Sequence, residues 1–164
     1  MGATGNTSYG YWAGDENNAD GTEIGRLDYS NDTATALVKG MLAGYMQRIC
    51  GFSSRANANP TTSGTQTRSA TQINGTPYGY WIGGDGGGSR YHRVDYSNDT
   101  ETASVRGNLH RSMSRNVAVS SLNYAYACGG GSNTNISRID YADDTATGLE
   151  KGNLATSPSY SSMA

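Results

Sequence analysis

The sequence predicts an all-β chain built from three copies of one short unit, and three observations support this. Only 19 of its 164 residues are Leu, Ile, Val or Phe, and 23 are Gly, a composition that excludes a bundle of long helices. The chain has 12 Tyr and 2 Trp, so aromatic side chains must supply much of the buried apolar area, as they often do in strands. The third observation is an internal repeat.

Three segments of 17 residues align without gaps. They start at Arg26, Arg93 and Arg138 and read RLDYSNDTATALVKGML, RVDYSNDTETASVRGNL and RIDYADDTATGLEKGNL. A tyrosine-rich stretch that runs into glycine precedes each segment, and we expect equivalent inner strands there, at Tyr9–Tyr11, Tyr78–Tyr80 and Tyr124–Tyr126.

Within one unit the side chains alternate with a period of two residues, which is typical of strands. In the third copy Tyr124, Tyr126 and Cys128 fall on one face of the first strand. Ser-Asn-Asp-Thr or Ala-Asp-Asp-Thr follows the second strand, and because these side chains cap their own backbone they predict a hairpin turn. About four short antiparallel strands in a glycine-punctuated unit of about 45 residues are typical of a β-propeller blade.

We expect one repeat domain over residues 1–164. Arg93 and Arg138 are 45 positions apart, whereas Arg26 and Arg93 are 67 positions apart, so about 22 extra residues follow the first copy. The extra segment is rich in Asn, Thr and Ser, which predicts a surface excursion with at most one added strand. The expected boundaries are blade 1 at about 1–42, the insertion at about 43–77, blade 2 at about 78–122 and blade 3 at about 123–164.

The unit also resembles a known repeat family. Its order is Tyr-x-Tyr-x-x-Gly-Gly, a variable loop, hydrophobic-Asp-Tyr, a turn, a third strand and Gly-x-Leu. This order resembles the kelch repeat, although the later Trp of kelch is missing at 36–38, 103–105 and 148–150. The motif DYSNDTATA, with a following Lys/Arg-Gly and Leu, is more similar to kelch-like repeats in predicted structural and tail-associated proteins of aquatic bacteriophages. The resemblance implies a β-propeller fold and an extracellular or virion-associated location.

An Arg and an Asp recur two positions apart on the second strand of each unit, as Arg26 with Asp28, Arg93 with Asp95, and Arg138 with Asp140. Neighbouring blades cover both faces of a propeller blade, so we expect a charge-assisted ladder in which each Asp meets the Arg of the same or the next blade. These carboxylates are equivalent by repetition, and each has its own cation. We therefore predict a structural role for them and no catalytic one.

No other residues form a recognisable catalytic or cofactor site, so we predict that the protein is not an enzyme and binds no cofactor. His92 and His110 stand where the other copies have different residues, and we expect them at the surface. The segment Asp15–Glu23 alternates acidic and amide side chains before a Gly, as calcium loops do. Its twelfth position would be Leu27 instead of a bidentate Glu, so we expect a solvated loop and no metal site.

Trp12 and Trp81 alternate with tyrosines, an arrangement that a lectin uses to stack sugars and a propeller uses to fill the space between blades. Repetition favours packing, and the third copy has Ala127 at this position. The alternative function is therefore a carbohydrate- or protein-binding propeller. Its partner would be a cell-surface glycan or protein, bound by the variable loops at 15–23, 84–91 and 130–136 and by the insertion.

Two features would matter in an extracellular protein. Five Asn-x-Ser/Thr sequons are candidate glycosylation sites, at Asn6, Asn31, Asn74, Asn98 and Asn135. Cys50 and Cys128 are too few for a disulfide framework, and whether they pair stays open. We expect Cys128, which aligns with Ala13 and Ile82, to be a small buried hydrophobe.

The charge balance argues against two classes of partner. The formal net charge is -2 and Lys and Arg are not clustered, so we expect no nucleic-acid binding. No apolar stretch approaches the length of a membrane span, so we expect no membrane insertion, and no signal peptide is visible.

Three blades are too few for a closed propeller, which has about four to eight, and they leave two faces uncovered. We therefore expect a homo-oligomer through the terminal strands and open blade edges, in which one chain's C-terminus completes the blade begun by the next chain's N-terminus. The product would be a closed ring or a fibre; otherwise the chain is part of a longer propeller. The predicted function is a non-enzymatic structural or adhesion subunit.

Overall fold

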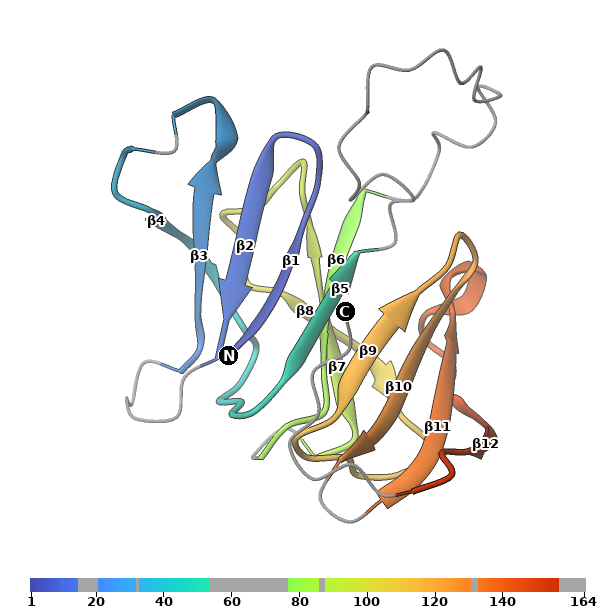
Figure 1. Ribbon diagram of the computed structural model, residues 1–164. Helices are drawn as coiled ribbons and strands as arrows, with labels where there is room; N and C mark the ends of the chain where they lie inside the picture. Colours follow the sequence, from blue (N-terminus) through green and yellow to red (C-terminus); the bar gives the residue numbers. More distant parts are fainter. Residues whose placement is uncertain (15–20, 32, 54–76, 86–87, 131–132, 157–164) are drawn as a thin grey trace.

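The computed structural model describes residues 1–14, 21–31, 33–53, 77–85, 88–130 and 133–156 of the chain. These residues form three four-stranded antiparallel sheets, which confirms the all-β prediction (Figure 1). Helical structure in this part is limited to short 3-10 turns, among them Tyr29–Asn31 and Tyr141–Asp143. None of the described helical segments is long and apolar enough to cross a bilayer.

Each sheet consists of four strands that follow one another along the chain, and we call it a blade. Blade 1 contains β1 (Gly2–Gly5), β2 (Tyr9–Ala13), β3 (Glu23–Asp28) and β4 (Leu37–Met41). Blade 2 contains β5 (Cys50–Ser53), β6 (Tyr78–Ile82), β7 (Arg90–Asp95) and β8 (Ser104–Asn108). Blade 3 contains β9 (Val117–Ser120), β10 (Tyr124–Gly130), β11 (Asn133–Asp140) and β12 (Leu149–Asn153).

The three sheets are arranged like consecutive blades of a propeller. Their first strands lie nearest to one another, with β1 against β5 and β5 against β9, while β4, β8 and β12 lie at the outer edges (Figure 1). The tyrosine strands β2, β6 and β10 are the second strands of their sheets, which are the equivalent inner positions expected for them.

Blades 2 and 3 begin one strand earlier than expected, whereas β1 lies within the expected bounds of blade 1. β5 lies in the region expected to be an insertion, and β9 lies in the region assigned to the end of blade 2. Residues 41–53 match residues 108–120 without a gap, and both stretches contain an Arg with positive φ, Arg48 at 51° and Arg115 at 56°. The extra residues therefore fall between β5 and β6, in 54–76, which lies outside the described residues. Cys-Gly-Phe-Ser and Val-Ala-Val-Ser share too few residue types for the repeat to be recognised there.

The turn after the third strand of each blade (β3, β7 or β11) is capped, but by the Asp that precedes the predicted four-residue motif and not by the motif itself. In each blade the Asp that ends this strand accepts a hydrogen bond of 2.9 Å from the backbone N–H two residues later, at Ser30, Ser97 or Ala142. The cap is therefore made within the blade, without a residue from a neighbouring blade.

The buried apolar side chains of the described residues form two clusters, and each cluster lies between two blades. The first, between blades 1 and 2, contains Tyr11, Ala13, Ile24, Leu42, Met46, Ile49, Trp81, Val94 and Ala103. The second, between blades 2 and 3, contains Phe52, Tyr80, Ile82, Tyr91, Leu109, Met113, Ala125, Ala127 and Ile139. Because a single twisted sheet buries little by itself, each blade is stabilised mainly by its neighbours.

Each blade thus has two different faces. The trailing face points toward the next blade and contains Tyr11, Ile24 and Leu42 in blade 1 and Tyr80, Tyr91 and Leu109 in blade 2. The residues at the matching repeat positions of blade 3 are Tyr126, Ile136 and Leu154. The leading face points toward the preceding blade and consists of Trp12 and Leu27 in blade 1, Trp81 and Val94 in blade 2, and Ala127 and Ile139 in blade 3. Among the described residues, no strand packs on the leading face of blade 1 or on the trailing face of blade 3.

Candidate functional site

The polar contact that joins blades 1 and 2 centres on one buried carboxylate. Asp99, which is 7% exposed, lies in the turn after β7. Its Oδ2 forms an ion pair with Nη1 of Arg26 on β3, at 2.6 Å. The same oxygen accepts a 2.9 Å hydrogen bond from the hydroxyl of Tyr11 on β2. Blade 2 thus supplies the anion, and the trailing face of blade 1 supplies both donors.

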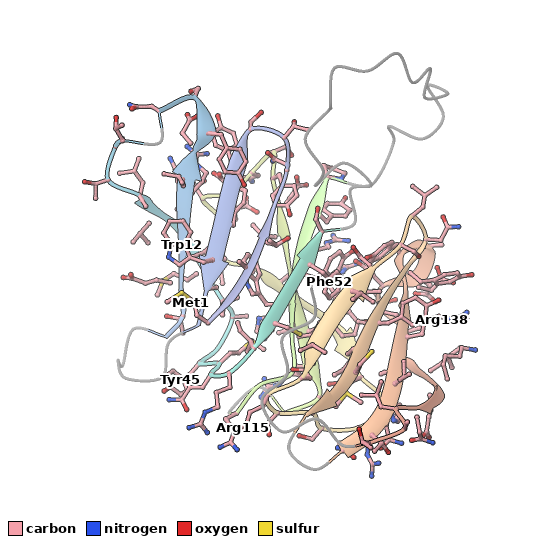
Figure 2. All side chains as sticks on the ribbon, in the orientation of Figure 1. Met1, Trp12, Tyr45, Phe52, Arg115 and Arg138 are labelled. Atoms are coloured by element: carbon pink, nitrogen blue, oxygen red, sulfur yellow. The ribbon has the colours of Figure 1, made fainter. Side chains whose placement is uncertain are left out.

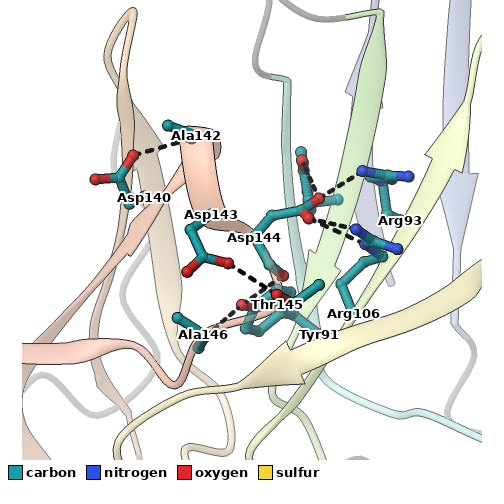
Figure 3. A network of polar contacts seen from close by, with 10 residues as sticks. Tyr91, Arg93, Arg106, Asp140, Ala142, Asp143, Asp144, Thr145 and Ala146 are labelled. Carbon is teal, nitrogen blue, oxygen red and sulfur yellow. Dashed lines mark hydrogen bonds and ion pairs between the residues drawn. The ribbon is translucent and has the colours of Figure 1, made fainter.

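The same contact recurs between blades 2 and 3 with an additional cation. Oδ2 of Asp144 accepts from Nη1 of Arg93 at 2.7 Å and from the hydroxyl of Tyr80 at 2.9 Å. Its Oδ1 accepts from Nε and Nη2 of Arg106 at 3.0 and 2.7 Å, so both oxygens are occupied (Figure 3). The hydroxyl of Tyr91 donates to the backbone carbonyl of Asp144 at 2.8 Å. This turn is the most extensively bonded polar contact between blades in the described residues.

The electrostatics keep this carboxylate charged and the phenols neutral. Burial alone would raise the pKa of Asp144, but hydrogen bonds from Arg106 and Tyr80 and the charge of Arg93 outweigh it, so its pKa is lowered. Burial raises the pKa of Tyr80 and of Tyr11, and the neighbouring carboxylates raise it further. Both hydroxyls therefore remain protonated and act as donors.

The expected charge ladder uses a different aspartate from the one the sequence pattern indicated. Asp28, Asp95 and Asp140 do not pair with the arginines two positions before them, because they cap their own turns. The pairing aspartates are the third residues of the four-residue turn motif, Asp99 and Asp144, which reach into the preceding blade. An Asp stands at this position in every copy, and this repetition could have identified the pairing aspartates. The Arg-x-Asp spacing on one strand favoured the other aspartate instead.

The third arginine of the series lies on the open trailing face of blade 3. Each of the three arginines stacks on the first Tyr of its blade, with 4.2, 4.0 and 4.2 Å from the guanidinium carbon to the ring centroid for Arg26, Arg93 and Arg138. Only Arg138 has no carboxylate partner within the described chain, and its buried Nε makes no hydrogen bond. A hollow of about 200 Å³ lies beside it.

The two tryptophans have different environments, so the sequence-based pairing of Trp12 with Trp81 as ligand-stacking residues needs correction. Trp81 is 0% exposed, and its Nε1 donates to the carbonyl of Gly2 at 3.1 Å, so it has no free face for a ligand. Trp12 is half-buried on the leading face of blade 1. Its ring lies over Gly25, where a Cβ would come within 2.5 Å of it, and it lines a hollow of about 320 Å³.

The candidate glycosylation sites also differ in exposure. Asn31 and Asn98 are exposed in turns, Asn6 caps a turn through its side chain, and Asn74 lies outside the described residues. Asn135 is buried, and its amide donates to the carboxylate of Glu150, so it is not available for modification. Among the described residues Cys50 and Cys128 are free thiols, and Cys128 is buried as expected.

His92 was expected at the surface but lies inside. It is 1% exposed, and its Nδ1 accepts a 3.3 Å hydrogen bond from the backbone N–H of Ala43. Burial, with the charge of Arg90 as the smaller cause, lowers its pKa to about 4, so the ring is neutral near pH 7. His110 is half-buried, with Nε2 4.0 Å from Oε1 of Glu150. The backbone N–H of His110 donates to the Ser137 hydroxyl at 3.4 Å, but neither imidazole ring is hydrogen-bonded to a serine or cysteine in the described part of the chain.

The described residues contain no group of His, Cys, Asp or Glu side chains arranged to hold a metal ion. Most of the segment considered as a calcium loop, 15–20, lies outside them. The site that the structure does assemble is thus the contact between blades, together with its uncovered counterparts at the two ends. Comparison of the chain with family models and with curated proteins finds no match.

Proposed function

We propose that the protein is a non-enzymatic structural or adhesion subunit that assembles with copies of itself through its open blade faces. The observation that carries this proposal is the position of the two hydrophobic clusters, because both lie between blades and none of the described apolar clusters lies within one. Blade 2 has neighbours on both sides, whereas blades 1 and 3 have one each. A stable assembly would cover the remaining two faces.

Exposed apolar residues on blades 1 and 3 support the proposal that another copy packs against these blades. Leu37 and Val38 are each 58% exposed in blade 1, and Leu149 is 54% exposed in blade 3. Val105, which matches Val38 in the middle blade, is 44% exposed as well, so all three blades carry exposed apolar side chains, and such side chains favour association over a purely monomeric existence. The N-terminal strand β1 already pairs with β2 of the same chain, so blade 1 has its four strands without a segment from another copy. The proposal therefore rests on faces and not on exchanged terminal strands.

The test is the mass and form of the purified protein, by light scattering and electron microscopy. We expect particles of two or more copies of the 17.3 kDa chain, as rings or filaments. A folded monomer at every accessible concentration would overturn the proposal. An extracellular or virion-associated location, which the kelch-like phage resemblance suggests, is tested by locating the protein with a specific antibody on virions or cell surfaces.

A lectin-like function is the second candidate, and the hollow beside Trp12 is the observation that favours it. This hollow has about 320 Å³ and is lined by an aromatic ring and the Glu23 carboxylate, groups that bind sugars in many proteins. Binding on a glycan array that is lost in Trp12→Ala and kept in Tyr45→Ala, an exposed aromatic in the loop between β4 and β5, would favour this function. If self-association covers this face, the two functions compete for the same surface.

A further inference from the structure

We propose that the trailing face of blade 3 binds the leading face of blade 1 of a second copy, so that copies join head to tail and continue the order of blades within the chain. This inference rests on the proposed self-association and specifies its interface. Figure 2 shows Trp12 and Arg138, which mark the two faces, on opposite sides of the molecule. One copy therefore carries both halves of the interface.

The trailing face of blade 3 repeats a surface that is covered twice within the chain. A Cβ on Gly40 would lie 2.5 Å from the carbonyl oxygen of Glu101, and one on Gly107 would lie 3.0 Å from that of Ala146. Both oxygens belong to the turn of the following blade, so these glycines allow that turn to approach closely. The matching Gly152 would meet nothing within 4 Å. Blade 3 thus keeps the glycine that the contact needs, without a neighbour in the described part of the chain.

The leading face of blade 1 has the complementary side chains. In the covered contacts Tyr96 stacks on Tyr11 with ring centroids 5.0 Å apart, and Tyr141 stacks on Tyr80 at 5.7 Å. Tyr29 is the matching residue of blade 1, and it is 51% exposed. In the head-to-tail contact it would stack on Tyr126, which is the only member of its own series that is not fully buried in the described chain.

Backbone groups match as well. In the covered contacts the N–H of Ala103 donates to the carbonyl of Met41 at 2.6 Å, and that of Gly148 donates to the carbonyl of Asn108 at 2.7 Å. The residue of blade 1 that matches the donors Ala103 and Gly148 is Ala36. The residue of blade 3 that matches the acceptors Met41 and Asn108 is Asn153. A second copy would bring this donor and acceptor together.

Charge sets the direction of the pairing. The buried Nε of Arg138 has no hydrogen-bond partner, and the two arginines that match it each bind a carboxylate of the following blade. In the first repeat the sequence has an Asp at that turn position too, at 32, which lies outside the described residues. Two trailing faces would instead place Arg138 against its own copy, and like charges repel. Head-to-tail contact is therefore favoured over a symmetric dimer.

Such a contact either closes or propagates. Two copies hold six blades, a number within the range of about four to eight in closed propellers. If the rotation does not close, the same contact extends into a filament. The interface is the same in both cases, so one experiment tests it.

The experiment blocks one face at a time. Gly152→Trp fills the open trailing face of blade 3, and Leu27→Lys places a charge on the leading face of blade 1. The positions that match Leu27, Val94 and Ile139, are 2% and 1% exposed in the covered contacts. The control for the first variant is Gly44→Trp, because a Cβ there also meets nothing within 4 Å. The control for the second is Leu122→Lys, at a residue that is 44% exposed in the loop before β10.

Sedimentation velocity of each variant alone and of their equimolar mixture gives the result. Each blocked variant should be a folded monomer, both controls should assemble as the wild type does, and the mixture should form dimers and nothing larger. In such a dimer the intact trailing face of Leu27→Lys binds the intact leading face of Gly152→Trp. This recovery also demonstrates that both variants fold.

Two outcomes would overturn the inference, and they are distinguishable. If the wild type assembles and Gly152→Trp assembles equally well, or if the mixture of blocked variants stays monomeric, the head-to-tail contact is wrong while self-association survives. If the wild type itself is monomeric, the proposed function fails together with this interface.

Discussion

The trailing faces of blades 2 and 3 carry the same types of residue in different surroundings. On blade 2, Tyr80 and Arg93 bind one carboxylate of the next blade. On blade 3, the matching Tyr126 is partly exposed and Arg138 has no carboxylate in the described chain. The comparison teaches that the interface residues recur with each repeat, whether or not a neighbour is present within the chain. The same substitution on a covered and on an open face can therefore separate the contribution of the residue itself from that of its contact with the neighbouring blade.

The largest contrast is expected for the two tryptophans of the leading faces. Trp81→Ala removes a fully buried ring between blades 1 and 2 and should lower the free energy of unfolding by about 4 kcal/mol. Trp12→Ala, at the open face of blade 1, should cost less than about 2 kcal/mol in dilute, unassembled protein, because its ring is only half-buried. Urea unfolding of both variants measures the difference. Equal losses would show that cover by the neighbouring blade does not determine the contribution of this position.

The second contrast compares the two buried carboxylates. Asp144→Asn leaves Arg93 and Arg106 without their anion and should cost about 3 kcal/mol. Asp99→Asn leaves only Arg26 without its anion and should cost at least about 1 kcal/mol less. Urea unfolding of the two variants gives the order, and a larger loss for Asp99→Asn would contradict it.

The pH dependence provides a control for the charge of Asp144. Its pKa is lowered in the folded chain, so its charge adds stability that is present above the ordinary aspartate pKa of about 3.9 and is lost as pH falls through the lower folded value. Asp144→Asn should therefore weaken the loss of stability in acid. If the variant lost stability in acid as steeply as the wild type, the ion pairs of Asp144 would contribute little to the free energy of unfolding.

The third contrast uses glycine. Gly107→Ala brings a Cβ within 2.4 Å of the hydroxyl of Tyr91 and 3.0 Å of the carbonyl oxygen of Ala146, and should cost about 2 kcal/mol. Gly152→Ala meets nothing within 4 Å and should change the stability of the dilute chain by less than about 0.5 kcal/mol. Thermal unfolding of both variants at low concentration checks this, and a tolerated Gly107→Ala would mean that the next blade can shift away.

The repeat predicted much of the fold, because its signals are local. Alternating side chains and turn motifs indicate strands and hairpins without reference to neighbours, and the all-β fold is confirmed. The turns are capped by Asp28, Asp95 and Asp140, which the sequence pattern had assigned to a charge ladder. The first strand of blade 2 was placed in the insertion because β5 and β9 share little beyond small and apolar residues. A pattern of that kind does not distinguish one short strand from another.

The contacts between blades were less accessible from the sequence. The arginine–aspartate ion pairs between blades join residues 73, 51 or 38 positions apart, and the choice between Asp95 and Asp99 as the partner depends on which carboxylate the turn directs outward. The burial of Trp81 and the exposure of Trp12 follow from their place in the blade order and not from their nearly identical local sequences. Local sequence therefore predicts the strands and turns within a blade. Which of its faces is buried depends on whether another blade follows or precedes it.

The smallest contrast concerns one hydroxyl. Tyr80→Phe removes a 2.9 Å hydrogen bond to Asp144 and should lower the free energy of unfolding by about 1 kcal/mol. The hydroxyl of Tyr126 makes no hydrogen bond within the described part of the chain, so Tyr126→Phe should leave the stability of the dilute protein unchanged. In a head-to-tail assembly that hydroxyl would meet a carboxylate of the next copy, and the same substitution should weaken association about five-fold, the equivalent of about 1 kcal/mol. Unfolding of the dilute chain and sedimentation at assembling concentrations measure the two effects separately. A loss of stability in the dilute Tyr126→Phe variant would show that the hydroxyl is already bonded within its own chain and that the two trailing faces are not equivalent.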